Sequence, residues 1–313
     1  KRPEGIDGLR RMMASADCLI EGFRPGVMER FGLGPDAALA ANPRLIYGRM
    51  TGFGQEGPLA ARAGHDLTYI AWSGVLHAIG HAGSRPVPPL NLVADYGGGT
   101  MFLVVGLLAA LVERAVSGRG QVVDAAMVDG SAMLAAPFYG FMASGIWQDR
   151  RGCNLLDSGT PFYDTYETAD GRHVAVACLE PQFFAEFARL LPLPEELAAA
   201  QYDRGCWPAM REAIAARIRE RSRDEWAAFF AQTDACVAPV LSLKEAPESE
   251  HAQARDAYAG IGEMVRPRPA PRFSRTATQV SGPPREDPAG TLAAFGLAQE
   301  EIEALASAGA VGR

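Results

Sequence analysis

Two segments place ionisable side chains where the backbone can meet a ligand. His65 and Asp66 follow Gly64, immediately before an apolar run over residues 67–72 that we predict to be helical. Asp95 stands just before three consecutive glycines, which permit a close backbone approach. Free amides at a helix N-terminus favour an anionic oxygen, and histidine exchanges a proton near neutrality. These residue types therefore support proton transfer beside a stabilised oxyanion.

A third segment, residues 21–32, carries two arginines directly after a predicted strand. Open α/β sheets bind ligands at this end of their strands. Pro25 fits the first turn of a helix, and Gly26 lets a ligand approach the backbone. Arg24 and Arg30 would then contact phosphate groups.

Each of these residues also has a structural interpretation. A lone histidine is often structural, and Asp95 could cap a helix or form a turn. Arg24 and Arg30 could be solvated side chains on an ordinary strand-to-helix turn. Glu180 lies between a predicted hairpin and the next helix, which is typical of a carboxylate at a helix start. Local context leaves both interpretations open.

Composition limits the classes of partner. The chain has 313 residues, of which 48% are hydrophobic and 21% charged, which is typical of a globular protein with one or two domains. A net charge of -7 argues against binding to nucleic acid or to an anionic membrane surface. An anionic ligand must therefore be held by a few local arginines.

The cysteines and apolar runs indicate a cytoplasmic protein. The five cysteines are widely spaced without a C-x-x-C pair, which predicts reduced thiols and no metal site. The longest apolar run, residues 101–112, is shorter than the roughly 20 residues needed to span a bilayer, so we expect a buried core helix there. No apolar stretch near Lys1 resembles a signal peptide.

The first part of the chain alternates helix-like and strand-like segments, which predicts a doubly wound parallel α/β sheet. The predicted helices cover residues 6–15, 36–41 and 100–116, and the strands cover residues 17–21, 45–50 and 121–125. Such a domain normally opens with a strand and a glycine-rich turn, whereas this chain opens on a charged segment. We therefore expect part of the domain to precede Lys1.

The second part predicts a smaller α+β domain. Asp170-Gly171 between two strand-like runs is a strong hairpin signal, and Ser222 with Glu225 forms a capping box before a helix. Residues 126–164 lack clear periodicity, which favours a crossing segment. The predicted organisation is a large domain over residues 1–125, a linker over 126–164, the small domain over 165–248, a linker over 249–268, and a return to the large domain over 269–313.

Together these segments resemble the class III CoA-transferase family and, within it, the α-methylacyl-CoA racemases. Phe23-Arg24-Pro25-Gly26 followed by Arg30 is highly specific to that family. The resemblance extends along essentially the whole chain, through residues 21–34, 52–58, 64–66, 91–99, 120–124, 179–182 and 237–240.

The resemblance implies epimerisation of 2-methylacyl-CoA through an enolate, within lipid metabolism. His65 and Asp95 would be the two bases on opposite faces of the substrate carbon, and Glu180 would partner His65. Coenzyme A would enter only as part of the substrate, with no other cofactor and no metal. The implied contacts to coenzyme A are Gly22, Phe23, Arg24, Pro25, Gly26, Val27, Arg30, Gly64, His65, Asp66, Leu67, Thr68 and Tyr69.

The resemblance also implies an interlocked homodimer, in which each chain threads its partner and the active site lies between the large domain of one chain and the small domain of the other. Threading would explain the unpatterned residues 126–164.

Two alternatives remain. A CoA-transferase of the same fold would use Asp66 as the nucleophile that forms an acyl-enzyme anhydride, although its motif usually reads Gly-Tyr-Asp. The histidine in Gly64-His65-Asp66 supplies a base and favours the racemase. The second alternative is a non-catalytic acyl-CoA-binding protein, which would bind the thioester without exchanging its α-proton.

Overall fold

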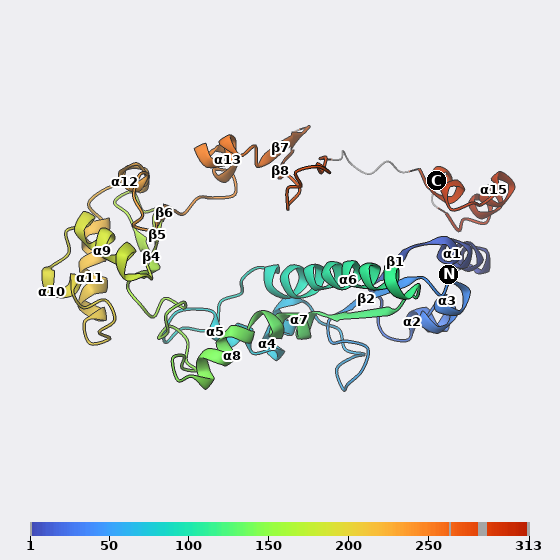
Figure 1. Ribbon diagram of the computed structural model, residues 1–313, viewed down its shortest axis with the longest axis horizontal. Helices are drawn as coiled ribbons and strands as arrows, with labels where there is room; N and C mark the ends of the chain where they lie inside the picture. Colours follow the sequence, from blue (N-terminus) through green and yellow to red (C-terminus); the bar gives the residue numbers. More distant parts are fainter. Residues whose placement is uncertain (1, 263, 281–286, 312–313) are drawn as a thin grey trace. The chain divides into compact units, whose positions relative to one another are not determined.

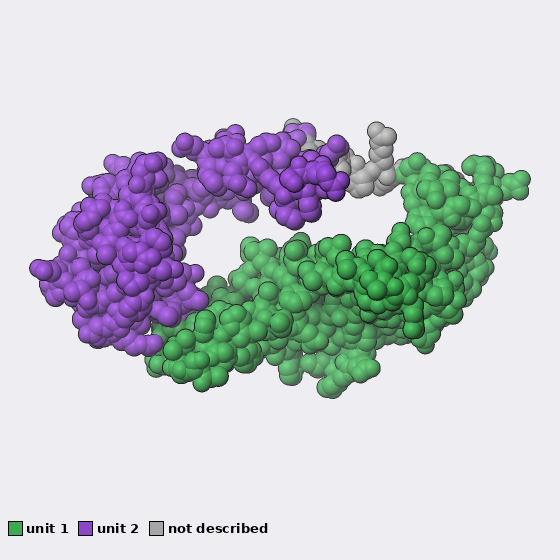
Figure 2. Space-filling model, viewed as in Figure 1, with its two compact units in different colours: residues 1–154, 287–313 green, residues 155–286 purple. Residues whose placement is uncertain are grey.

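The computed structural model describes residues 2–262, 264–280 and 287–311 (Figure 1). The chain divides into two compact units (Figure 2). The first unit contains residues 1–154 and 287–313, and the second contains residues 155–286. Each unit has its own sheet and its own hydrophobic core.

The first unit is built on a three-stranded parallel sheet, as its alternating pattern predicts. Its strands are β1 (Cys18–Glu21), β2 (Ile46–Thr51) and β3 (Val122–Ala126), in the order β1-β2-β3. Consecutive side chains of a strand point to opposite faces, so Ile46 and Tyr47 of β2, both fully buried, enter different cores.

Helices cover both faces of this sheet. Tyr47 packs with residues of α1 (Pro3–Ser15), α2 (Val27–Arg30) and α3 (Pro35–Ala41). On the other face, Leu103 and Leu107 of α6 (Met101–Ser117) pack on Ile46. The predicted helices at residues 6–15 and 100–116 are thus confirmed.

The outer face of α6 contradicts the prediction of a buried core helix. Only Leu103, Leu107 and Ala110 are buried, because one face of the helix docks on the sheet. Together with the preceding π-helix η1 (Leu92–Thr100), α6 forms a 26-residue helix, Leu92–Ser117, whose length and apolar composition alone would suffice to cross a membrane. Large exposed apolar side chains on α6 are Met101, Phe102, Val104, Val105, Leu108, Val112 and Val116.

Residues 126–164 are not the unpacked crossing segment that their weak periodicity predicts. They contain α7 (Met127–Leu134) and α8 (Ala136–Ala143). A Cβ atom added to Gly130 would lie 1.8 Å from the carbonyl oxygen of Gly98, so α7 meets η1 backbone to backbone. Such a contact between glycines leaves no hydrophobic period in the sequence.

The second unit contains the predicted hairpin, formed by β4 (Tyr163–Glu167) and β5 (His173–Ala177), with β6 (Val237–Pro239) antiparallel to β5. The predicted capping box is also present, since Ser222 and Glu225 bond reciprocally at the start of α12. The core is rich in aromatic residues, including Phe162, Phe184, Phe187, Trp226 and Phe230. Its helices are α9 (Pro181–Leu190), α10 (Glu195–Ala198), α11 (Trp207–Ile218) and α12 (Arg223–Phe230).

Residues 249–268, predicted to be a linker, contain regular structure. A 3-10 turn, η2 (Ala246–Glu248), precedes α13 (Glu250–Ala254), and β7 (Tyr258–Ile261) pairs with β8 (Met264–Pro267).

The C-terminal helices α14 (Pro288–Ala294) and α15 (Gln299–Ser307) pack on α1 in the first unit. Met12 joins the cluster of Leu292 and Leu305, and Arg11 pairs with Glu301.

Candidate active site

The predicted ligand-binding segments follow β1 and β2 at the carboxyl end of the parallel sheet. Residues 22–26 link β1 to α2, and residues 52–65 link β2 to α4 (Asp66–Trp72). A Cβ atom on Gly22 would lie 3.5 Å from the carbonyl oxygen of Met50, so the first turn lies against the end of β2. Both segments thus belong to the edge where parallel sheets bind ligands.

The arginine turn, residues 22–26 with Arg30, exposes two cations. Arg24 and Arg30 are exposed, and within the described part of the chain neither guanidinium makes a hydrogen bond or an ion pair. Gly26 has a φ of 81°, which favours glycine. Pro25 lies in the turn and not in the first helical turn as predicted, because α2 begins at Val27. Two available guanidiniums can bind phosphate oxygens.

His65 immediately precedes α4, with its side chain exposed. The Thr68 hydroxyl accepts the His65 N–H at 2.9 Å and donates to the His65 carbonyl at 2.7 Å. This exchange holds the backbone of His65 at the helix start. The amides of Asp66 and Leu67 occupy the first turn, where no intrahelical acceptor exists, so they can donate to an oxyanion.

The Asp66 carboxylate connects α4 to η1. Asp66 is only 3% exposed, and its Oδ2 accepts the N–H of Ala94 at 2.7 Å and that of Asp95 at 2.9 Å. Its Oδ1 is buried and has no hydrogen-bond partner among the described residues. The fold therefore brings the segments that carry His65 and Asp95 together through Asp66.

Asp95 is half-buried inside η1 and does not cap a helix. Asn91 donates its Nδ2–H to Asp95 Oδ2 at 3.2 Å, and the Thr100 hydroxyl donates to the Asp95 carbonyl at 2.9 Å. Asn91 was not among the predicted site residues. Its position four residues before Asp95 was the available signal, because residues four apart share a helix face.

Tyr69 packs beneath the loop that carries His65. Cβ atoms on Gly52 and Gly64 would lie 2.1 Å and 2.4 Å from Cε1 of the tyrosine, so both glycines make room for its ring. Phe53 meets the ring edge to face with a centroid distance of 5.0 Å. Burial raises the pKa of Tyr69, and the negative charge of Asp95 raises it further. The role of Gly52 in this packing has no local sequence signal.

Glu180 belongs to the second unit, where it is exposed and immediately precedes α9. This position agrees with the structural interpretation of a carboxylate at a helix start. Its predicted partnership with His65 stays a prediction.

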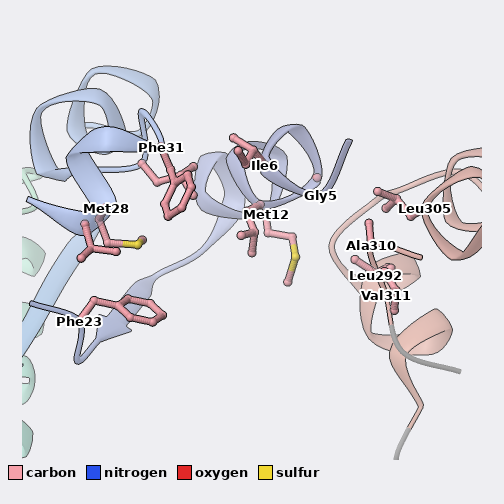
Figure 3. Close-up of a pocket in the computed structure, with 14 residues that line it drawn as sticks. Gly5, Ile6, Met12, Phe23, Met28, Phe31, Leu292, Leu305, Ala310 and Val311 are labelled. Carbon is pink, nitrogen blue, oxygen red and sulfur yellow. The ribbon is translucent and has the colours of Figure 1, made fainter. Parts of the chain in front are cut away.

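An apolar cavity of about 460 Å³ lies between α1, the arginine turn and the C-terminal segment. Figure 3 shows Phe23 and Met28 on one side of it, and Leu292 and Val311 on the other. No residue of 64–69 and no part of η1 lines it. In the described ranges, no three His, Cys, Asp or Glu residues are grouped so that they could hold a metal ion.

The chain belongs to CoA-transferase family III, whose family model matches residues 1–289. It is 45% identical to the alpha-methylacyl-CoA racemase of Mus musculus over 98% of this chain and 82% of that protein. It is 41% identical to the Homo sapiens protein of the same name, with the same two coverages. A solved CAIB/BAIF family protein from Brucella suis superposes with a TM-score of 0.78 at 27% identity, covering 93% of this chain and 79% of that one.

Proposed function

We propose that the protein epimerises 2-methylacyl-CoA thioesters by removing and returning the α-proton. The observation that carries this proposal is the Asp66 carboxylate, which ties the segment of His65 to that of Asp95. The similarity to two racemases along 98% of the chain supports it.

In the proposed mechanism, His65 and Asp95 act on opposite faces of the substrate carbon. With His65 neutral and Asp95 protonated, the histidine removes the proton of one epimer and the aspartic acid protonates the other face. The reverse reaction starts from the converse pair of protonation states. A neighbouring carboxylate orients a catalytic histidine and stabilises its cation. We assign this role to Glu180, which the other chain of the proposed homodimer would supply.

The enolate oxygen needs stabilisation, because a proton next to a thioester carbonyl is weakly acidic. We assign this role to the amides at the start of α4, where a preorganised donor is worth about 3–4 kcal/mol in the transition state. Arg24 and Arg30 would hold the phosphates of coenzyme A, together with the backbone of residues 22–27 and 64–69. The proposed reaction uses no cofactor beyond the coenzyme A of the substrate.

Because the chain belongs to a CoA-transferase family, the alternative function is that of a CoA-transferase, in which Asp66 attacks the thioester. Two features argue against it. The carboxylate is 3% exposed, and its Oδ2 already accepts two backbone amides. A carboxylate that is buried and holds the backbone of the neighbouring helix η1 is poorly placed to attack a thioester.

We also propose that the protein is an interlocked homodimer in a reducing, cytoplasmic compartment, where it acts in lipid metabolism. The exposed apolar face of α6 supports the dimer, because monomers rarely leave large apolar patches in water. A membrane is the other environment that this face could meet, so the oligomeric state is a direct test.

The decisive experiment supplies each epimer of a 2-methylacyl-CoA separately in deuterated water. Chiral analysis measures inversion, and mass spectrometry measures deuterium at the α-carbon. The proposal predicts both events from either epimer. Binding without exchange would instead identify a non-catalytic acyl-CoA-binding protein. Transfer of coenzyme A to an added carboxylic acid, with release of the original acyl group as its free acid and without inversion, would identify a transferase.

A further inference from the structure

A row of charged residues crosses the sheet directly below the arginine turn. In the parallel register, Arg49 of β2 lies between Glu21 of β1 and Asp124 of β3. Register partners in neighbouring strands point to the same face. Arg49 is 6% exposed and Glu21 4% exposed, so these two members of the row are buried, whereas Asp124 is exposed.

Arg49 bonds to both flanks of the arginine turn. Its Nε–H donates to Glu21 Oε1 at 2.8 Å, and its Nη1 pairs with Glu29 Oε1 at 2.9 Å. Glu21 ends β1 and Glu29 lies in α2, so one guanidinium ties together the chain on both sides of residues 22–26. The Glu21 Oε2 in turn accepts the N–H of Phe23 at 2.7 Å, inside the turn.

The surrounding chain accommodates this arrangement. A Cβ atom at Gly34 would lie 2.7 Å from Cγ of Glu29, so the glycine leaves room for the glutamate to reach Arg49. Burial alone would raise the pKa of Glu29, but hydrogen bonds from its own backbone N–H and from Arg49 lower that pKa below its usual value. The Arg49 Nη2 is buried and has no partner among the described residues. A buried guanidinium that keeps an unsatisfied donor is costly, so a core built for stability alone would gain little from it.

We infer that Arg49 is a positioning residue for nucleotide recognition: by clamping Glu21 and Glu29, it holds the turn so that Arg24 and Arg30 face the phosphates of coenzyme A. This inference rests on the proposed function. Arg49 is buried and acts through the turn, not on the substrate. Its loss should therefore affect the nucleotide end of the substrate and spare the proton transfer.

Two variants weaken, in different ways, the contacts of Arg49 with Glu21 and Glu29, which we call the clamp. Arg49→Lys keeps the buried charge but cannot bond two carboxylates with one planar fork. Glu29→Gln removes the charge of a side chain that is 43% exposed, so the fold is expected to tolerate it. Matched controls are Arg114→Lys and Asp17→Asn, because Arg114 pairs with Asp17 at 2.8 Å with a side chain only 11% exposed. That pair lies at the opposite, amino end of β1.

The test compares a 2-methylacyl-CoA with the corresponding pantetheine thioester, which lacks the nucleotide. Thermal unfolding first confirms that each variant is folded. Glu29→Gln and Arg49→Lys should each raise the KM for acyl-CoA roughly tenfold. They should raise the Kd for coenzyme A, measured by calorimetry, by the same factor, because each variant loses one charged hydrogen bond. In both variants, kcat and turnover of the pantetheine thioester should stay within about twofold of the parent. The two controls should change none of these quantities.

The inference is overturned if the clamp variants lose turnover of both thioesters equally, if their KM and Kd match the parent, or if the controls show the same increase. A parent protein that inverts neither thioester would refute the proposed function. In that case the calorimetric Kd of coenzyme A still decides the role of Arg49.

Discussion

Asp66 accepts the backbone N–H of Asp95 at 2.9 Å, across 28 intervening positions of the chain. The same oxygen accepts the N–H of Ala94. Asp66 begins α4 directly after His65, so this carboxylate couples the two candidate proton-transfer groups. A residue that a transferase would use as its nucleophile has a positional role here.

Replacing Asp66 should affect stability more than chemistry. Asp66→Ala leaves two backbone amides without their acceptor and should lower the free energy of unfolding by about 3 kcal/mol. Epimerisation should fall but remain measurable, because both bases are still present. Asp66→Asn keeps an acceptor oxygen and should lie between the parent and Asp66→Ala. Complete loss of turnover in a folded Asp66→Asn protein would favour the nucleophile instead.

The two bases should be separable by isotope exchange. His65→Ala or Asp95→Asn should block inversion while leaving slow exchange of one epimer's α-hydrogen through the surviving base. Each epimer is supplied separately in deuterated water, and deuterium uptake is measured alongside inversion. Inversion of both epimers at the parent rate by both variants would rule out the two-base assignment.

The arginine turn should account for much of the affinity for coenzyme A. Arg24→Ala or Arg30→Ala should weaken acyl-CoA binding by about 1.5–3 kcal/mol, the contribution of a hydrogen bond to a charged group. Calorimetry measures the affinity, and Arg119→Ala is the control variant. Arg119 is exposed just before β3, away from the arginine turn. Unchanged affinity in both turn variants would refute the phosphate contact.

The contact between η1 and α7 should tolerate no side chain. Gly130→Ala would place a Cβ atom 1.8 Å from the Gly98 carbonyl oxygen, so the helices must separate. We expect a loss of about 1–3 kcal/mol of unfolding free energy, as for overpacking, and a lower kcat because Asp95 lies on η1. Gly140→Ala is the matched control, because a Cβ atom at Gly140, in α8, would meet nothing within 4 Å. Equal stability and kcat in the two variants would contradict the prediction.

The exposed face of α6 should support the homodimer. Replacing Val105 and Leu108, which are 60% and 58% exposed, with glutamate should shift the mass measured by light scattering from dimer toward monomer. Buried charges in an apolar interface are strongly unfavourable. A parent protein that is monomeric at micromolar concentration would refute the dimer itself.

Much of the first unit follows from local patterns. The alternation of apolar segments predicts its strands and main helices, and in the second unit the capping box of Ser222 and Glu225 predicts the start of α12. These signals are local because a helix or strand shows its buried face as a period in the sequence. The glycines beside His65 and Asp95 likewise indicate close backbone approaches before any contact is known.

How these parts meet depends on tertiary packing. Local patterns identify which segments carry His65, Asp95 and the arginine turn. They could not predict that Asp66 joins the first two, because that contact depends on how α4 packs on η1. The helix α6 shows the same limit: its apolar sequence predicted burial, yet the sheet covers one face and leaves Val105 exposed. Composition determines how apolar a helix is, whereas the packing of neighbouring elements determines which of its faces water can reach.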